Sequence, residues 1–339
     1  MVVIEWPYLA ATALLASVEF SLVWALSTFW AETSFVQSAI ALNKGFLSLC
    51  HLDENNPYFQ VLGVMLLLGC LVFWVLGRLT GADWAFDPHW SLHGMLCVIF
   101  YQHHPALLGG FNSARSNLLL LFFALYAVEL TYHYFQVSHF CFWKEEDWRY
   151  TRFRKALTGY GYWLWSLFMV YVLQAAMIFP YGAGIYGVHV SNAPLNWVDG
   201  VACLSFVISL FLQTVGDYQM FIFRKKRDEA KKQGKPFPVN LETGLWYYSR
   251  HPAYVGEWGI WFSAYLFSVA AGGPWWAIVG PILCLLAFAA SIPLTEKRVM
   301  VWNTTPERQA AYAKYQRTTS AFFPWFKFRD PQEKAKKQQ

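Results

Sequence analysis

Charged residues are scarce in this chain of 339 residues, because Asp, Glu, Lys and Arg together make up only 14% of it while hydrophobic residues make up 56%. Soluble globular domains carry roughly 25% charged and 45 to 50% apolar residues. The shortage of charge argues against a disordered chain and against a nucleic-acid-binding domain, which needs dense basic patches. Several uncharged runs approach the roughly 20 residues that a helix needs to cross a bilayer. The composition therefore predicts a membrane protein.

The six cysteines form no metal-binding or disulfide pattern. No two of them make a Cys-x-x-Cys pair, and most lie inside apolar runs. Buried free thiols behave as small hydrophobic side chains, so we expect neither a secreted disulfide scaffold nor a metal site. The first apolar run follows no charged n-region and precedes no small-residue cleavage site. We therefore expect it to be a retained membrane helix and not a signal peptide.

The apolar runs predict an all-α, polytopic integral membrane protein with seven to eight transmembrane helices. Two runs, the third and the seventh, are short enough to be re-entrant, which leaves the count between seven and eight. The runs cover residues 8–30, 59–80, 91–108, 117–135, 160–179, 201–223, 257–271 and 275–294.

The net charge of +5 comes mainly from three basic segments, residues 144–155, 224–235 and 297–339, whereas residues 181–198 contain no Asp, Glu, Lys or Arg. Basic loops tend to stay on the cytosolic side of a membrane. The three segments are therefore predicted to be cytosolic and the uncharged segment to lie on the opposite side. Alternating crossings then place both termini in the cytosol.

Two short motifs bear on location. Asn303-Thr304-Thr305 is a glycosylation acceptor, but the predicted topology puts it in the cytosol, where it should stay unmodified. The chain ends in Lys336-Lys337-Gln338-Gln339, which resembles the dilysine retrieval signal of endoplasmic-reticulum membrane proteins. A solvated basic tail explains this end equally well. We predict a location in the endoplasmic-reticulum membrane.

The segment from Ser249 to Glu257 has the form of a helix entrance, with the sequence Ser-Arg-His-Pro-Ala-Tyr-Val-Gly-Glu. Pro252 suits the first helical position, where its missing N–H is not needed. A helix N-terminus flanked by Arg250 and His251 offers donors to an anionic cofactor. The alternative is an interfacial anchor, in which aromatic and basic residues only mark the membrane surface.

This segment resembles the signature of the steroid 5α-reductase C-terminal-domain family, membrane reductases that use NADPH. The similarity extends in the same order from Asp87 to Trp325, but not to the first 80 residues. We therefore divide the chain into N-terminal membrane helices (1–80), a reductase-like membrane domain (81–328) and a basic cytosolic tail (329–339). The other similar stretches are Asp87-Pro88-His89-Trp90, Leu130-Thr131-Tyr132-His133-Tyr134-Phe135, Glu146-Asp147-Trp148-Arg149-Tyr150, Gly216-Asp217-Tyr218-Gln219, residues 292–298 and residues 319–325.

Three polar residues of the sixth apolar run share one helical face, because Gln213, Asp217 and Arg224 are spaced by four and seven residues. The spacing resembles that of the Asn, Asp and Arg with which steroid reductases hold NADPH. An internal ion pair between Asp217 and Arg224 or Arg227 is the alternative. The resemblance also implies cofactor contacts from the residues of the Arg-His-Pro segment, with Glu257 at the nicotinamide carboxamide. These residues are Arg250, His251, Tyr254 and Glu257.

Two residues are the candidates for catalysis. Tyr134 follows His133 as the catalytic tyrosine does in the steroid reductases, and a neutral hydroxyl suits hydrogen bonding to a carbonyl oxygen. A place in an interfacial aromatic belt is the alternative. Asp87, in an Asp-Pro-His-Trp turn, is either a carboxylic acid of the site or the N-cap of the following helix.

The resemblance implies an NADPH-dependent oxidoreductase that reduces a carbon-carbon double bond of a sterol, polyprenyl or enoyl lipid taken from the bilayer. One departure leaves alternatives open, because Ala253 stands where family reductases carry an Asn that contacts the cofactor. The isoprenylcysteine carboxyl methyltransferases, which use S-adenosylmethionine, share a similar Arg-His-Pro run. A catalytically silent protein that binds a lipid or a partner is the third alternative. Glu296 is expected to pair with its neighbour Lys297 or Arg298.

Overall fold

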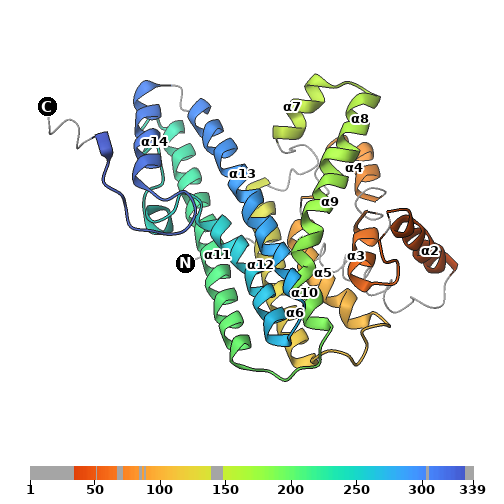
Figure 1. The fold of residues 1–339 in the computed structure, drawn as a ribbon. Helices are drawn as coiled ribbons and strands as arrows, with labels where there is room; N and C mark the ends of the chain where they lie inside the picture. Colours follow the sequence, from red (N-terminus) through yellow and green to blue (C-terminus); the bar gives the residue numbers. More distant parts are fainter. Residues whose placement is uncertain are drawn as a thin grey trace. The chain divides into compact units, whose positions relative to one another are not determined.

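The computed structural model describes residues 34–50, 52–66, 72–83, 86–87, 89–138, 148–302 and 305–332. The predicted all-α fold is confirmed for these residues, whose one extended pairing is an isolated parallel bridge between Ser249 and Ser320. The predicted first span, residues 8–30, lies outside them. The α-helices in Figure 1 are α2 (Ser34–Leu49), α3 (Pro57–Leu66), α4 (Trp74–Thr80), α5 (His89–His103), α6 (Ser113–Ser138), α7 (Trp148–Ala156), α8 (Tyr160–Ser166), α9 (Leu173–Ile178), α10 (Ala183–His189), α11 (Trp197–Lys232), α12 (Pro252–Ala271), α13 (Val279–Trp302) and α14 (Pro306–Thr318).

Four helical stretches in the described residues are long and apolar enough to cross a membrane: Ser113–Val137, Tyr160–His189, Trp197–Lys232 and Trp275–Val301. They coincide with the predicted fourth, fifth, sixth and eighth spans. The chain is therefore a multi-pass helical membrane protein, but a count of seven or eight spans is not confirmed. Within the described residues, the predicted span at 91–108 falls mostly into the 15-residue α5, and the described parts of 59–80 include α3 and α4.

The predicted fifth span is one helical stretch with a change of pitch. Between α8 and α9 the backbone forms a π-helix over Leu167–Val172, and between α9 and α10 it forms a 3₁₀ turn over Phe179–Gly182. Pro180 lies at the start of this turn, where its missing N–H is tolerated. π-Helical turns are rare and often occur where side chains must be aimed at a site.

The described chain separates into two compact units, which we describe individually. Unit 1 runs to Ala202 and includes Ala264–Gly280, whereas unit 2 consists of Cys203–Ser263 and the chain from Pro281 onward. Helices α11, α12 and α13 each contribute to both units. The division predicted from the sequence, at residues 80 and 328, stays a prediction.

In unit 1, helices α5 and α6 pack closely along their length. A side chain at Gly94 would overlap the ring of Phe123, since an added Cβ would lie 2.1 Å from a ring carbon. Farther along the pair, the hydroxyls of Ser91 and Thr131 are 2.5 Å apart and both residues are buried. This contact sets the end of α6 beside the beginning of α5.

A buried ion pair ties together the opposite end of unit 1. The guanidinium of Arg115, fully buried, donates to both carboxylate oxygens of Asp199 at 2.7 and 2.9 Å. It also donates to the backbone oxygens of Ala193 and Pro194, both at 2.9 Å. One side chain of α6 thereby holds the loop before α11 and the first turn of α11. The pair neutralises a charge on the side of the membrane that we predict to be non-cytosolic.

In unit 2, helices α11 and α12 are in backbone contact. An added Cβ at Gly256 would lie 2.5 Å from the backbone nitrogen of Gln213 and from the backbone oxygen of Ser209. One at Gly216 would lie 3.2 Å from the nitrogen of Ala253. Glycine at these positions therefore lets the two helices approach to the distance that larger residues exclude.

Helix α14 and the segment after it complete unit 2. Thr305 caps the helix by accepting from the backbone N–H of Arg308, and Pro306 takes the first helical position. The following segment folds back, with Phe328 N–H donating to the oxygen of Thr318 at 2.8 Å. Arg317 donates to both carboxylate oxygens of Asp330 at 3.1 and 3.2 Å.

We expect the ion pair between Arg115 and Asp199 to stabilise the fold only while both charges are present. Asp199→Leu leaves a buried guanidinium without its counter-charge and should cost about 3 to 5 kcal/mol of unfolding free energy. The double variant Arg115→Met/Asp199→Leu removes both charges and should recover part of that loss. Thermal unfolding in detergent measures both. A double variant less stable than the single one would contradict this role.

The stability of the segment after α14, residues 319–332, should change with pH only at acidic pH. The hydrogen bond from Arg317 lowers the pKa of Asp330. The contact is therefore fully stabilising above the ordinary carboxyl pKa of about 4 and is lost as pH falls through the lowered value. Hydrogen exchange of residues 319–332, corrected for intrinsic rates, should show constant protection from about pH 8 to 5.

The matched variants for this contact are Asp330→Asn and, as the control, Glu307→Gln on the exposed start of α14. Asp330→Asn should lower protection at every pH, whereas Glu307→Gln should behave as wild type. Loss of protection in the wild type between about pH 8 and 5 would show that another group controls the segment.

Candidate functional site

The Arg-His-Pro segment forms the helix entrance that the sequence predicts. A 3₁₀ turn (Gly244–Tyr247) precedes it, and α12 begins at Pro252. The backbone oxygen of His251 accepts from the N–H groups of Tyr254 and Val255 at 3.1 and 3.3 Å. The segment thus lies where a loop of unit 2 turns into an apolar helix.

The carboxylate of Glu296, on α13, is the centre of a buried polar network. Arg250 donates to it from Nε at 2.6 Å and from Nη2 at 3.2 Å. His251 Nε2 lies 3.2 Å from Oε1, and Gln316 Nε2 donates to Oε2 at 2.8 Å. Glu296 is only 7% exposed. A carboxylate in such surroundings requires these partners.

The network reaches the C-terminal segment through Arg250. Nη1 donates to the backbone oxygen of Gln316 at 2.6 Å and to that of Thr319, while its backbone N–H donates to Ser320 at 2.9 Å. Beside it, the hydroxyl of Ser249, fully buried, donates to the oxygen of Phe322 at 2.5 Å. The segment after α14 is therefore fastened to the helix entrance by side chain and backbone.

Two of the predicted cofactor residues thus have structural partners within the protein. The expectation that Glu296 pairs with Lys297 or Arg298 did not foresee its contacts with Arg250 and His251, because these residues are 46 and 45 positions away in sequence. The signal that could have found them is a lone carboxylate in an apolar helix, which requires a cation. A cofactor role for Arg250 and His251 stays a prediction.

Tyr254 and Glu257 lie in the first turns of α12. The ring of Tyr254 is sandwiched between His251, with centroids 5.1 Å apart, and Phe288, 4.5 Å away. One carboxylate oxygen of Glu257 accepts from the indole of Trp261 at 2.9 Å. Both side chains are half-buried. The stack fixes the tyrosine ring, and the indole fixes one oxygen of the carboxylate.

The three polar residues predicted to share one helical face all lie on α11 in unit 2. Gln213 is buried at the point where α11 meets Gly256 of α12, Asp217 is half-buried, and Arg224 is exposed. The structure therefore brings Gln213, Asp217 and Arg224 onto a helix that packs against the one carrying Tyr254 and Glu257.

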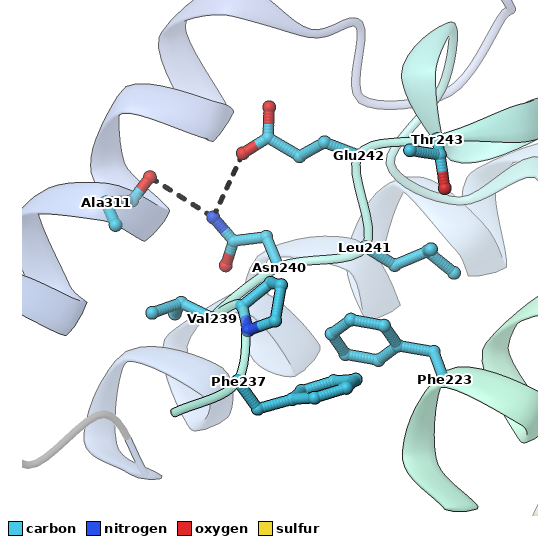
Figure 2. Close-up of a pocket in the computed structure, with 9 residues that line it drawn as sticks. Phe223, Phe237, Val239, Asn240, Leu241, Glu242, Thr243 and Ala311 are labelled. Carbon is cyan, nitrogen blue, oxygen red and sulfur yellow. Dashed lines mark hydrogen bonds between the residues drawn. The ribbon is translucent and has the colours of Figure 1, made fainter. Parts of the chain in front are cut away.

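A pocket of about 430 Å³ lies beyond Phe223, where α11 leaves its apolar part. Figure 2 shows the rings of Phe223 and Phe237 on one side and Asn240 on the other. Asn240 Nδ2 donates to the oxygen of Ala311 at 3.2 Å and to Glu242 Oε1 at 3.3 Å. The pocket is lined by Phe223 of α11, the loop residues Phe237, Pro238, Val239, Asn240, Leu241, Glu242 and Thr243, and Ala311 of α14.

In unit 1, Asp87 is the end of a directed chain of hydrogen bonds. The indole of Trp90 can only donate, so Gln174 receives it on Oε1, at 2.7 Å, and points Nε2 at the hydroxyl of Tyr150, 2.6 Å away. The Tyr150 proton is thereby directed to Asp87 Oδ1 at 3.3 Å. In this series of hydrogen bonds, Oδ1 of Asp87 is the final acceptor.

Tyr134 is half-buried near the end of α6, with its ring in edge contact with Phe135 at 5.6 Å. The bond between Ser91 and Thr131 aligns the two helices at this end. One turn beyond Thr131 on α6 is Tyr134, and one turn before Ser91 is Asp87. The two catalytic candidates therefore belong to the same end of the α5 and α6 pair.

Asp83 was not singled out from the sequence, yet it is the most enclosed carboxylate of unit 1. It is fully buried and accepts from the hydroxyls of Tyr162 at 2.6 Å and Tyr171 at 2.9 Å. Arg154 lies 3.2 Å away, and Arg78 pairs with the other oxygen. Tyr171 comes from the π-helical stretch. Two cations and two hydroxyls satisfy this carboxylate internally, which indicates a structural role.

The network around Glu296 should control access to the C-terminal segment. Glu296→Gln removes the counter-charge of the half-buried Arg250, so trypsin should cleave at Arg317, Lys327 or Arg329 several-fold faster than in the wild type. Mass spectrometry of the early fragments measures the rate. Lys297→Gln, on the adjacent exposed side chain, is the matched control and should leave cleavage unchanged. The reverse order would show that Glu296 pairs with Lys297 instead.

Proteins of similar sequence identify the family. A family model described as a protein of unknown function, DUF1295, matches residues 73–319. An uncharacterized protein of Schizosaccharomyces pombe is 26% identical over 290 residues, which cover 80% of this chain and 80% of that relative. No solved structure matches the chain significantly. The family match spans well over half of the sequence and includes both Asp87, with its hydrogen-bonding partners, and the Arg-His-Pro segment. This multi-pass membrane protein therefore belongs to the DUF1295 family.

Proposed function

We propose that the protein is a membrane oxidoreductase that uses NADPH to reduce a carbon-carbon double bond of a lipid. The observation that carries the proposal is the backbone contact of α11 with α12, which sets Gln213, Asp217 and Arg224 beside the helix bearing Tyr254 and Glu257. An amide, a carboxylate and a guanidinium along one face of an apolar helix are costly in a membrane, and such residues often mark a ligand site.

The chemistry of these side chains fits a dinucleotide. The amide of Gln213 and the carboxylate of Asp217 suit ribose hydroxyls or a carboxamide, and the guanidinium of Arg224 suits a phosphate. Lys225 and Lys226, both exposed, add positive charge. Glu257, which accepts a hydrogen bond from Trp261, is proposed to meet the nicotinamide carboxamide.

Arg250 has a different role in this proposal. Its donors are directed to Glu296, Gln316 and Thr319, so we assign it to holding the helix entrance and not to a phosphate. Ala253 removes an amide that similar reductases use, and its backbone lies against Gly216. Binding at this position then relies on the α11 residues, which makes Asp217 the residue to test.

For the reaction, bound NADPH supplies a hydride, and the chain must stabilise negative charge on the carbonyl oxygen of the lipid. We propose that the hydroxyl of Tyr134 donates a hydrogen bond to that oxygen. Asp87, held by Tyr150 at 3.3 Å, is proposed to accept a hydrogen bond from the lipid at the same end of α5 and α6. The lipid, of sterol, polyprenyl or enoyl type, would enter from the bilayer of the endoplasmic reticulum.

Ligand protection in thermal unfolding tests the proposal. NADPH should raise the melting temperature of the detergent-purified wild type, and Asp217→Asn should lower its apparent affinity about tenfold or more because a charged acceptor is lost. Glu229→Gln, at an exposed position farther along the same helix, is the matched control and should bind as the wild type does.

Two outcomes would contradict the proposal. Protection by S-adenosylmethionine and not by NADPH would identify a methyltransferase of the isoprenylcysteine type. Protection by neither ligand, in a protein that unfolds cooperatively, would indicate a catalytically silent membrane protein.

A further inference from the structure

The pocket beyond Phe223 has the dimensions and walls of a site for a flat ring. Its volume, about 430 Å³, lies at the lower end of the range of roughly 300 to 1,000 Å³ for small-ligand sites. The rings of Phe223 and Phe237 meet with centroids 5.0 Å apart at an angle of 53°, and Val239 and Leu241 add apolar surface. Aromatic walls of this kind bind nucleobases by stacking, worth roughly 1 to 3 kcal/mol per base.

The amide of Asn240 is fixed in one orientation. Both partners of its nitrogen, the backbone oxygen of Ala311 and the carboxylate of Glu242, are acceptors. Lys327 pairs with the other oxygen of Glu242. Figure 2 shows the amide oxygen of Asn240 turned away from both partners, on the side of Val239. Asn240 therefore offers an acceptor, which suits an amino group on the ligand.

Positive charge lies one turn from the aromatic wall. Lys226 and Arg227 follow Phe223 by three and four residues on α11, so they share its face. Lys226 is exposed, whereas Arg227 is paired with Asp228 at 2.9 Å. An amino-bearing flat ring with a phosphate attached nearby is the ligand that matches both features. A phospholipid would match the apolar walls and the charge, but it would leave the oriented amide without a purpose.

We propose that this pocket binds the adenine base of a 2′-phosphorylated adenine nucleotide, with Asn240 accepting from the exocyclic amine and Lys226 binding the 2′-phosphate. This inference rests on the proposed function and names the part of the dinucleotide that the pocket holds. The aromatic rings confer affinity, the amide selects adenine, and the lysine selects the phosphorylated ribose.

Calorimetric titration of the full-length protein in detergent with adenosine 2′,5′-bisphosphate tests this assignment without the nicotinamide half. The wild type should bind the bisphosphate about tenfold or more tightly than adenosine 5′-monophosphate. Lys226→Ala should abolish that preference, and Asn240→Leu should weaken both nucleotides about tenfold. Lys232→Ala, an exposed position near the end of the same helix, is the matched control. Because Lys226 is exposed, its variant remains informative if Asn240→Leu does not fold.

The results separate this inference from the proposed function. If NADPH protects the protein while the bisphosphate binds equally to wild type, Lys226→Ala and Asn240→Leu, the base lies elsewhere and only this inference falls. If neither nucleotide binds, both fall. Micelles of phosphatidic acid are the last probe. Binding of these micelles that requires Lys226, in a protein that ignores the bisphosphate, would assign the pocket to a lipid and overturn the inference.

Discussion

The candidate nucleotide site depends on the contacts that the buried carboxylate of Glu296 makes with its neighbours. A single buried anion on α13 orients Arg250 and His251, and through Arg250 it fastens the C-terminal segment. The Arg-His-Pro segment, which looks from its sequence like a set of ligand contacts, is in the structure first a joint between three parts of unit 2. We propose that a ligand binds to the helix faces that this joint holds in place.

The same physical constraint shapes unit 1. Charges inside an apolar bundle are expensive unless paired, and the chain pairs them at both ends of the unit. Arg115 and Asp199 close one end around a loop. Asp83, with two arginines and two tyrosines, closes the part near the π-helical stretch. The hydrogen-bonded series that ends at Asp87 is built from the uncharged side chains of Trp90, Gln174 and Tyr150.

The sequence predicted the features that depend on neighbouring residues. The all-α class, four long apolar helices and the start of α12 at Pro252 follow from local hydropathy and helix-capping chemistry, and each is confirmed. Pairings over long distances in sequence could not be predicted, because no local pattern marks which cation will meet a buried carboxylate. Glu296 with Arg250 and Asp83 with Arg154 are of this kind. The count of seven or eight spans is not confirmed, and of the apolar run at 91–108 only the part up to His103 lies in α5.

We propose that α11 and α12 carry a dinucleotide at the cytosolic side of the membrane. The most direct measurement is a density map of the full-length protein prepared with saturating NADPH. We expect density for the nucleotide along α11 from Gln213 to Arg224, with the adenine base between Phe223 and Asn240. A map in which that face of α11 is covered by the protein's own side chains, or in which the nucleotide lies elsewhere, would contradict it.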